Sequence, residues 1–418
     1  MLGSVYPNED ANLNIVNNLS GVLKNNNNIE YYLITQYKKF ACSEMMDGIT
    51  MHRVFVPEFQ LRKGKKSLFQ DILNTIIHGL RYAVTGRRYY IQFLYKHGLD
   101  KLLSNKKFDV TIAISAPFFP VFCLLKSKTQ TPVIYYQLDP YMSHSSCFAN
   151  VSKKTGVKRY NKRLSEEKSV CQLSRKIIMT ELIYNDYQNS ELSEYLKKSE
   201  ILDFPNLKRR EFTSDSSYNI HYDKNKINLT FSGYLYNNYI RQPDFMFKLI
   251  RLLCAKRSDV MLNLVGSYNL EVFKPSYINE FIRPIQKNIT FWDKVKSEFA
   301  INSLLQSDIL INIGNTIPNQ IPSKIIDYIS TGKPIINICK LKNCPTIKYT
   351  ERYPACLNIF EEDGLPDRIV DNVYEFCLEN KERQIPYENI EKLYPECSTL
   401  EVAQRLMSII EDAVNNEE

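Results

Sequence analysis

The sequence predicts an α/β protein with two doubly wound, mostly parallel sheets, and three observations lead to this prediction. The chain has 418 residues, which is too long for one hydrophobic core, so two or three domains are expected. Short apolar stretches alternate with amphipathic stretches in both halves of the chain, as they do in βαβ units. Residues 207–226 are polar and lack periodicity, and we interpret them as a linker between the halves.

The first half, residues 1–206, is predicted to form the first domain. Apolar stretches at 109–115 and 132–137 are typical of neighbouring strands of a parallel sheet, with a helix at 118–125 between them. Further strands are expected at 31–35, 54–56, 176–179 and 201–204, and further helices at 12–23, 165–173 and 187–197.

The second half repeats this alternation, and residues 227–397 are predicted to form the second domain. Strands are expected at 228–231, 261–265, 289–291, 309–313, from 335 onward, and at 356–359. Helices are expected at 244–254, 277–285 and 298–305, and an amphipathic helix at 399–414 follows a break at Pro395.

Composition indicates a globular protein, because 44% of the residues are hydrophobic and 24% are charged. The ten cysteines show neither a CxxC pair nor a zinc-like spacing with histidine, and no signal peptide precedes them. We interpret them as reduced thiols of a cytoplasmic protein. The longest apolar stretch, 110–125, is interrupted by two prolines and is shorter than the roughly 20 residues that a membrane span needs.

Residues 307–336 carry the most specific signal. An apolar strand at 309–313 is followed by a Gly-Asn turn, a proline-containing loop, a helix that opens around Lys324 and ends at Gly332, and a second strand. In such a unit a ligand lies beyond the carboxyl end of the strand, against free N–H groups, and a diphosphate suits that place. The alternative is an ordinary buried turn with a solvated Lys324.

The run PSKIIDYISTGKPII, residues 322–336, resembles the donor-site segment of family 4 glycosyltransferases, which have the GT-B fold. Residues 231–243, 262–267 and 289–311 are similar to further segments of that family. The resemblance implies two Rossmann-like domains facing a central cleft, with a C-terminal helix, residues 398–415, returning to the first domain. It also implies transfer of a sugar, with retention of configuration, from a nucleotide-sugar bound by the second domain to a carbohydrate acceptor.

The resemblance also implies donor-site residues. Arg241 and Lys324 are expected to stabilise the departing diphosphate, where negative charge develops. Gly233, without a Cβ, allows the backbone to approach the ligand. The other expected donor-site residues are Asn315, Gln320, Pro322, Ser323 and Asp327. The alternative for Asn315 and Gln320 is capping of the loop, and for Asp327 a carboxylate on the helix surface.

The chain departs from the family pattern at three positions. Where the family often has two glutamates eight positions apart, this chain has Asn319 and Asp327. Asp327 keeps a carboxylate for the ribose hydroxyls, whereas Asn319 does not. A glycine usual after the strand at 289–291 is replaced by Asp293. A nucleotide-sugar epimerase of the same fold and a non-catalytic homologue that binds nucleotide-sugars therefore stay open as alternatives.

On the acceptor side, Asp139 follows the predicted strand at 132–137 and is the expected catalytic carboxylate of the first domain. The alternative is an Asp-Pro turn in which the aspartate bonds its own backbone. Glu166, Glu181 and His144 are weaker candidates. The sequence has no Asp-x-Asp pair at a strand end, so we expect neither a metal nor any cofactor beyond the nucleotide-sugar co-substrate.

Positive charge is concentrated in one block. The formal net charge is +8, and residues 61–108 contain eleven Lys and Arg against two Asp, with aromatic residues between them. Basic residues mixed with aromatics suit an anionic membrane surface; the alternative is a solvated helical face. Nucleic acid is not expected, since no recognition motif accompanies the charge. We therefore expect a lipid-linked glycan acceptor, a role in surface polysaccharide assembly, and a peripheral position at the inner membrane face.

Overall fold

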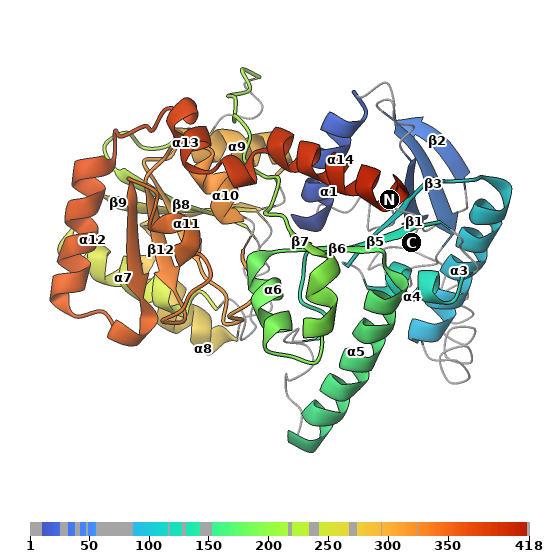
Figure 1. The fold of residues 1–418 in the computed structure, drawn as a ribbon. Coiled ribbons are helices and arrows are strands. Elements are labelled where there is room, and N and C mark those ends of the chain that lie inside the picture. Colours follow the sequence, from blue (N-terminus) through green and yellow to red (C-terminus); the bar gives the residue numbers. More distant parts are fainter. Residues whose placement is uncertain are drawn as a thin grey trace, which may run out of the picture. The chain divides into compact units, whose positions relative to one another are not determined.

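The protein was analysed as a computed structural model that describes residues 11–25, 32–37, 42–46, 49–55, 87–115, 118–127, 131–142, 153–215, 220–233, 242–266, 274–293, 295–322 and 324–415. The chain divides into two compact units (Figure 1). Unit 1 comprises Met1–Pro205 together with Thr399–Glu418, and unit 2 comprises Asn206–Ser398.

Unit 1 contains a four-stranded parallel sheet in the order β4-β5-β6-β7. Every residue of β4 and β5 is buried, as expected for a parallel sheet covered on both faces. The bounds are β4 Thr111–Ile114, β5 Val133–Gln137, β6 Lys176–Met179 and β7 Ser199–Ile201. The associated helices are α3 Arg87–Asn105, α4 Phe119–Leu125, α5 Lys153–Leu173 and α6 Glu181–Gln188.

A further three-stranded sheet in unit 1 is only partly parallel. β1 (Tyr32–Tyr37) pairs in parallel with β3 (Ile49–Phe55), whereas β2 (Cys42–Met46) pairs antiparallel with β3. β2 was not predicted, and β3 begins earlier than the predicted strand at 54–56. Polar residues such as His52 and Arg53 interrupt β3, so its pattern is not an apolar run.

The helix predicted at 187–197 was wrong. The chain instead forms α6, which ends at Gln188, and a separate 3-10 helix, η2 (Ser193–Lys198). Between them the Ser190 hydroxyl accepts a hydrogen bond from the backbone N–H of Leu192 at 3.1 Å. Such a local side-chain bond competes with helix continuation. Helix α5 is longer than predicted. Its first half is basic and mostly exposed, so it shows no apolar periodicity from which a helix could be predicted.

The C-terminal helix belongs to unit 1, as the fold prediction required. α14 (Thr399–Asn415) runs beside α1 (Ala11–Leu23), although the two are the opposite ends of the chain (Figure 1). The Arg175 guanidinium donates to the carbonyl of Ala413 at 2.8 Å, and Arg405 donates to the carbonyl of Ile201 at 3.0 Å. These bonds join α14 to segments that follow α5 and end β7.

Unit 2 is built on a six-stranded parallel sheet in the order β10-β9-β8-β11-β12-β13. Counted within the unit, this order is 3-2-1-4-5-6, so the strand order reverses between β8 and β11. Ligands of open α/β sheets bind at such a switch point. The strands are β8 Ile227–Ser232, β9 Val260–Gly266, β10 Ile289–Asp293, β11 Ile309–Ile313, β12 Ile335–Cys339 and β13 Cys356–Phe360.

Of the helices predicted in unit 2, those at 244–254, at 298–305 and around Lys324 are present. The predicted helix at 277–285 is a short irregular segment, α8 (Pro275–Tyr277) followed by a π-helical turn and a 3-10 turn. Three helices, α11, α12 and α13, were not predicted. The remaining bounds are α7 Asp244–Lys256, α9 Ser297–Gln306, α10 Lys324–Ile329, α11 Ile347–Thr350, α12 Asp367–Asn380 and α13 Tyr387–Leu393.

A row of asparagines crosses the buried sheet of unit 2. The Asn312 amide donates to Asn337 at 2.7 Å, and the Asn337 amide donates to Asn358 at 2.8 Å and to Thr346 at 2.9 Å. The three asparagines occupy the same register position of β11, β12 and β13. Buried amides are tolerated here because each finds a hydrogen-bond partner on the next strand.

The described residues of the segment 207–226, which we interpret as a linker from its composition, belong to unit 2. Ile220 is buried, and the Tyr222 hydroxyl donates to the carbonyl of Ser303 at 3.1 Å. This segment is held by hydrogen bonds of its polar side chains rather than by an apolar face. Its composition therefore resembles that of a linker. Within the described part of the chain, no helix combines the length and apolar character that crossing a bilayer requires.

Candidate functional site

The switch point of unit 2 brings the predicted donor segment to the carboxyl ends of two central strands. β8 ends at Ser232 and is followed by Gly233, and β11 ends at Ile313 and is followed by Gly314. The chain then loops through residues 314–322 before α10 begins at Lys324. The strand-loop-helix-strand order predicted for 307–336 is therefore present.

Two side chains of α10 form hydrogen bonds with the last residue of β8. The Lys324 ammonium donates to the carbonyl of Ser232 at 2.9 Å. The Tyr328 hydroxyl accepts from the backbone N–H of Ser232 at 2.7 Å and lies 3.1 Å from its carbonyl. Residues four apart share one face of a helix, and these two hold that face of α10 against β8. The structure thus gives Lys324 a definite position at the switch point, and its charge is not simply solvated.

Gly233 lies next to Lys324, as the donor-site prediction requires. A Cβ at Gly233 would be 3.5 Å from the Lys324 Nζ, which is ordinary contact. The adjoining turn is closer: Gly266 has φ +127°, and a Cβ there would lie 2.6 Å from the carbonyl oxygen of Gly233. Only glycine fits at Gly266, because both its backbone angle and the clash exclude a side chain.

The loop from 314 to 322 is held by its own hydrogen bonds. The Asn315 side-chain amide donates to the backbone carbonyl of Gln320 at 3.2 Å, so the loop-capping alternative for Asn315 is realised. The Pro322 carbonyl accepts from the backbone N–H of Ile325 at 3.0 Å. Asn319, which stands where the family often has glutamate, is buried.

Asp327 meets a cation that sequence reasoning missed. The Arg210 guanidinium lies 2.6 Å from the Asp327 carboxylate and also donates to the Ser330 hydroxyl at 3.2 Å. Burial raises the pKa of Asp327, while Arg210, Lys324 and Lys208 act in the opposite direction. The carboxylate expected to meet a ribose is therefore already part of an ion pair. Arg210 was overlooked because it lies in the segment interpreted as a linker.

Several candidates fall outside this description. Arg241, Ser323 and His144 are outside the described residues, as are residues 61–86 of the basic block and the side chain of Asp293.

In unit 1, Asp139 follows the carboxyl end of β5 as predicted and is half-buried. The Ser115 hydroxyl, just beyond the end of β4, accepts from the backbone N–H of Leu138 at 2.9 Å and of Asp139 at 3.4 Å. These bonds fasten the turn that carries Asp139. Glu181 opens α6, and Glu166 accepts a hydrogen bond from the Tyr141 hydroxyl.

The neighbour of Glu166 is the more unusual carboxylate. Glu167 is 1% exposed and accepts hydrogen bonds from the Gln137 amide, the Tyr187 hydroxyl at 2.9 Å and the backbone N–H of Met142 at 3.0 Å. Burial raises its pKa to about 7, with the hydrogen bonds from Tyr187, Gln137 and Met142 opposing the rise. Glu167, on α5, thus bonds to Gln137 and Met142, the two ends of the segment that contains Asp139. The sequence held a signal for this carboxylate, because Glu167 lies at helical spacing from Leu164, Val170 and Cys171, which are also buried.

Comparison with known proteins identifies the architecture. No protein-family model and no curated protein matches this sequence. Solved structures do match: WaaG, a glycosyltransferase involved in lipopolysaccharide biosynthesis, has a TM-score of 0.63 at 12% identity, with 98% of each chain covered. Sucrose-phosphate synthase from Thermosynechococcus elongatus gives 0.63 at 11% identity, covering 96% of this chain and 93% of that one. Anabaena HepE in complex with UDP and glucose gives 0.58 at 11%, covering 98% of both.

The chain has the GT-B fold. The fold prediction, including the return of the C-terminal helix to unit 1, is therefore confirmed. The roles predicted for individual residues in this GT-B chain stay predictions, because identities near one tenth establish the architecture alone.

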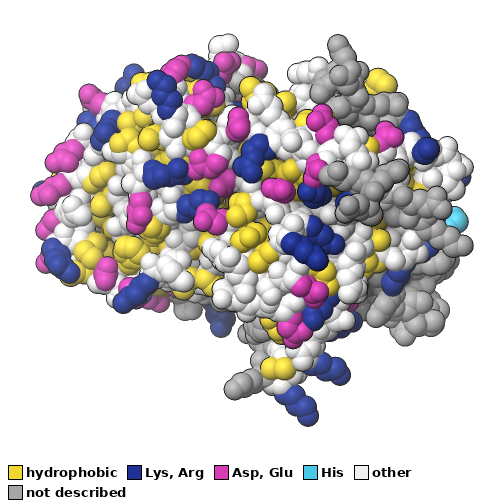
Figure 2. All heavy atoms as spheres, in the orientation of Figure 1, with side chains coloured by type: hydrophobic (Ala, Val, Ile, Leu, Met, Phe, Trp, Pro, Cys, Tyr) yellow, Lys and Arg dark blue, Asp and Glu magenta, His cyan; other side chains and the backbone are white. Residues whose placement is uncertain are grey.

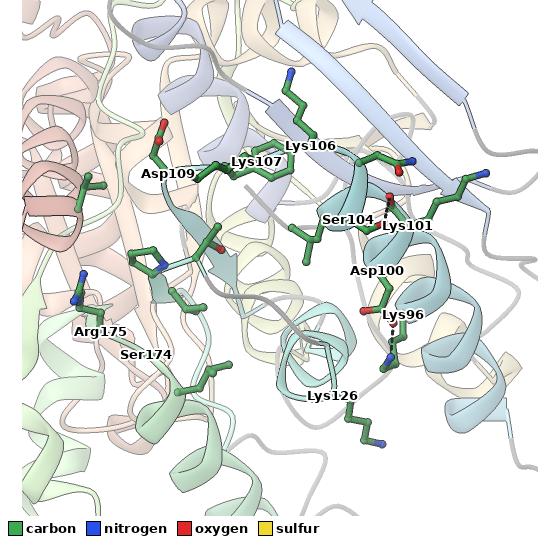
Figure 3. Close-up of a pocket in the computed structure, with 18 of the residues that line it drawn as sticks. Lys96, Asp100, Lys101, Ser104, Lys106, Lys107, Asp109, Lys126, Ser174 and Arg175 are labelled. Carbon is green, nitrogen blue, oxygen red and sulfur yellow. Dashed lines mark hydrogen bonds and ion pairs between the residues drawn. The ribbon is translucent and has the colours of Figure 1, made fainter. Parts of the chain in front are cut away.

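One hollow of this GT-B chain lies away from Asp139. It has a volume of about 1510 Å³ and is lined by the amino ends of β4 and β5 and the ends of α3 and α5. Asp139 is at the opposite, carboxyl edge of the same sheet. Figure 3 shows α3 with its lysines on one side of the hollow and Ser174 and Arg175 on the other. The lining is basic, because only two of its charged residues, Asp100 and Asp109, are acidic. The basic ones are Lys96, Lys101, Lys106, Lys107, Lys126, Arg175 and Lys198.

Proposed function

We propose that this GT-B chain transfers a sugar from a nucleotide-sugar donor to a carbohydrate acceptor, with retention of configuration. The observation that carries the proposal is the position of Lys324 beside Gly233 at the switch point of unit 2. A cation there can balance charge that develops on a departing diphosphate. The solved structures of similar fold include one with UDP and glucose and one with ADP and acarbose, which supports a donor of this class.

Donor binding is tested by Lys324→Met, which removes the charge and keeps most of the stem. We expect the Kd for UDP or ADP, whichever the wild type binds, to rise about tenfold to a hundredfold, as for loss of a charge-assisted hydrogen bond. Isothermal titration calorimetry measures this. Lys287→Met, at an exposed position of the same unit, is the control.

Because Lys324 also bonds Ser232, the melting temperature of each variant must be recorded. Undiminished affinity in a folded Lys324→Met variant would contradict the proposed site. Arg241→Ala extends the test to the second predicted cation.

Transfer itself is tested by following the anomeric configuration of the product by NMR. We propose transfer without a divalent metal, so activity is expected to survive EDTA. A product formed from donor alone would instead support the epimerase alternative. Binding with neither transfer nor donor hydrolysis would support the non-catalytic alternative suggested by Asn319 and Asp293.

We further propose that the acceptor is lipid-linked, that the product belongs to a surface polysaccharide, and that the enzyme works at the inner face of an anionic membrane. The basic hollow supports the membrane contact, since Lys101 and Lys107 are exposed at its rim. A second basic surface was not predicted: residues 153–163 of α5 contain six Lys and Arg and no acidic residue. Figure 2 shows the projecting dark blue side chains of this region at the tip of α5.

The membrane proposal is tested by co-sedimentation with phosphatidylcholine vesicles that contain or lack phosphatidylglycerol. Lys101→Glu/Lys107→Glu should lower binding to the anionic vesicles about tenfold or more, because each basic residue near such a surface contributes about 1 kcal/mol. Lys224→Glu/Lys287→Glu makes the same charge change on exposed positions of unit 2 and should have little effect. A loss only with Lys154→Glu/Lys158→Glu would place the contact on α5 instead.

A further inference from the structure

Two cysteines of unit 2 lie together at the carboxyl end of β12. Cys339 is the last residue of that strand, and Cys344 follows the turn 340–343. Both are buried, with exposures of 0% and 3%, and both sulfur atoms border one polar cluster, in which the Asn337 amide contacts Cys339 and the Thr346 hydroxyl, and Thr346 contacts Cys344. The turn between them is exposed at Lys342 and Asn343, and Cys344 directly follows it.

The surroundings make the two sulfur atoms unequal. Hydrogen bonds from Cys339, from Thr346 and from the backbone N–H of Lys340 hold the pKa of Cys344 below its usual value. Donation to Cys344, together with burial, raises the pKa of Cys339. The Thr346 hydroxyl lies 3.1 Å from the Cys344 Sγ, and the Asn337 amide donates to the Cys339 Sγ at 3.2 Å. The arrangement is that of a thiolate nucleophile, Cys344, with an adjacent resolving thiol.

Two other cysteines of unit 2 provide a contrast. Burial raises the pKa of Cys377 to about 12 and that of Cys254 to about 11. Cys377 is as buried as the pair, whereas Cys254 is partly exposed.

The sulfur of Cys344 also touches the predicted donor loop. A Cβ built on Gly314 would lie only 2.8 Å from the Cys344 Sγ, so the sulfur occupies the space that a side chain at Gly314 would need. The backbone N–H of Gly314 donates to the carbonyl of Ile338, beside Cys339, at 2.8 Å. Gly314 begins the loop that carries Asn315 and Gln320. The position of this sulfur is therefore coupled to the start of the loop.

We propose that Cys339 and Cys344 form an oxidative modification site, at which a hydroperoxide converts the dithiol to a disulfide and displaces the start of the donor loop. The Cys344 thiolate attacks one peroxide oxygen, the O–O bond breaks, and the leaving oxygen takes up a proton to form water or an alcohol. The Cys339 sulfur then attacks the Cys344 sulfenic acid. An S–S bond forms, and the hydroxyl leaves as water with the Cys339 proton.

Bond formation requires the two sulfur atoms to approach each other to about 2.05 Å. Cys344 then withdraws from Gly314, and its bonds with Thr346 and Lys340 are strained or lost.

Peptide mass spectrometry with differential alkylation tests the modification on the full chain. After brief treatment with dilute hydrogen peroxide, we expect a 339–344 disulfide while Cys377 and Cys254 remain reduced. In Cys339→Ser the reaction should stop at a Cys344 sulfenic acid, which dimedone traps. Oxidation of Cys254 or Cys377 ahead of the pair, or oxidation of Cys344 without the crosslink in the wild type, would overturn the proposal.

The effect on the loop rests on the proposed function and is measured separately by calorimetry with UDP and with ADP. Affinity should fall severalfold on oxidation and return after dithiothreitol, and Cys344→Ser should keep its affinity in peroxide. Failure of the reduced protein to bind either nucleotide would count against the proposed function and leave the mass-spectrometric result standing. Unchanged affinity in a protein that carries the disulfide would overturn the displacement of the loop.

Discussion

At the scale of single residues, the half-buried carboxylate of Asp327 and the buried one of Glu167 are stabilised differently. Asp327 faces a guanidinium, that of Arg210. Within the described part of the chain, Glu167 instead accepts from neutral donors: a side-chain amide, a phenol and a backbone N–H. Neutral donors offset desolvation of a buried charge less than a cation does. For this reason we expect Glu167 to make the folded protein sensitive to pH.

The pKa of Glu167 rises from 4.5 to about 7 on burial, so the folded state holds more protons than the unfolded state between these values. The free energy of unfolding should therefore fall as pH rises from about 4.5 to about 7. Glu167→Gln removes this dependence, and its stability relative to wild type should rise by up to about 3 kcal/mol across that window. Urea unfolding at several pH values measures the difference.

Glu166→Gln, the same chemical change on the neighbouring half-buried residue, is the control. Parallel stability curves for wild type and Glu167→Gln would show that this carboxyl does not titrate in the window.

At the scale of elements, the strands of unit 2 depend on polar bonds as well as on apolar burial. Asn337 lies fully buried in β12 and connects its two neighbouring strands through Asn312 and Asn358. Removing its side chain takes a hydrogen bond from each partner. Asn312 is buried, whereas Asn358 is half-buried and keeps its bond from Thr350. A buried group left unsatisfied costs about 1–3 kcal/mol.

Asn337→Ala should therefore lower the free energy of unfolding by about 2–4 kcal/mol, as measured by urea denaturation. Asn343→Ala, an exposed position in the following turn, should change it by no more than about 0.5 kcal/mol. Similar losses in the two variants would mean that the asparagine row does not contribute to stability.

Elements were predictable where the pattern is local. β6 occupies the predicted residues 176–179 and β11 the predicted residues 309–313, because buried parallel strands are continuous apolar runs. Helices α12 and α13 were missed. α12 exposes most of its surface, with only Val370, Val373, Cys377 and Asn380 buried, and α13 is a short helix with Ile390 alone buried.

At the scale of the whole molecule, the chain returns to unit 1 after completing unit 2. The buried face of α14 consists of Val402, Ala403, Leu406, Ile409 and Ala413, and that of α1 includes Ile15, Val16, Leu19 and Leu23. Unit 1 is thus completed by a helix that follows unit 2 in the sequence.

Leu406→Ala should cost about 2–5 kcal/mol, the usual range for truncating a fully buried leucine. Hydrogen exchange should localise the loss of protection to unit 1, in α1 and β4 to β6, with unit 2 unchanged. Leu400→Ala on the same helix is the matched control, since Leu400 is 55% exposed. Equal loss of protection in both units would contradict the assignment of α14 to unit 1.

The sequence by itself determined the two α/β blocks and the strand-loop-helix unit at 307–336, because hydrophobic periodicity and turn residues act over a few neighbouring positions. It also indicated that Lys324 and Gly233 belong to one site. Only the tertiary structure decided which side chains meet: Lys324 with Ser232, Asp327 with Arg210, Glu167 with Tyr187, and Cys344 with Gly314. These partners lie far apart along the chain, and the order of strands in each sheet brings them together.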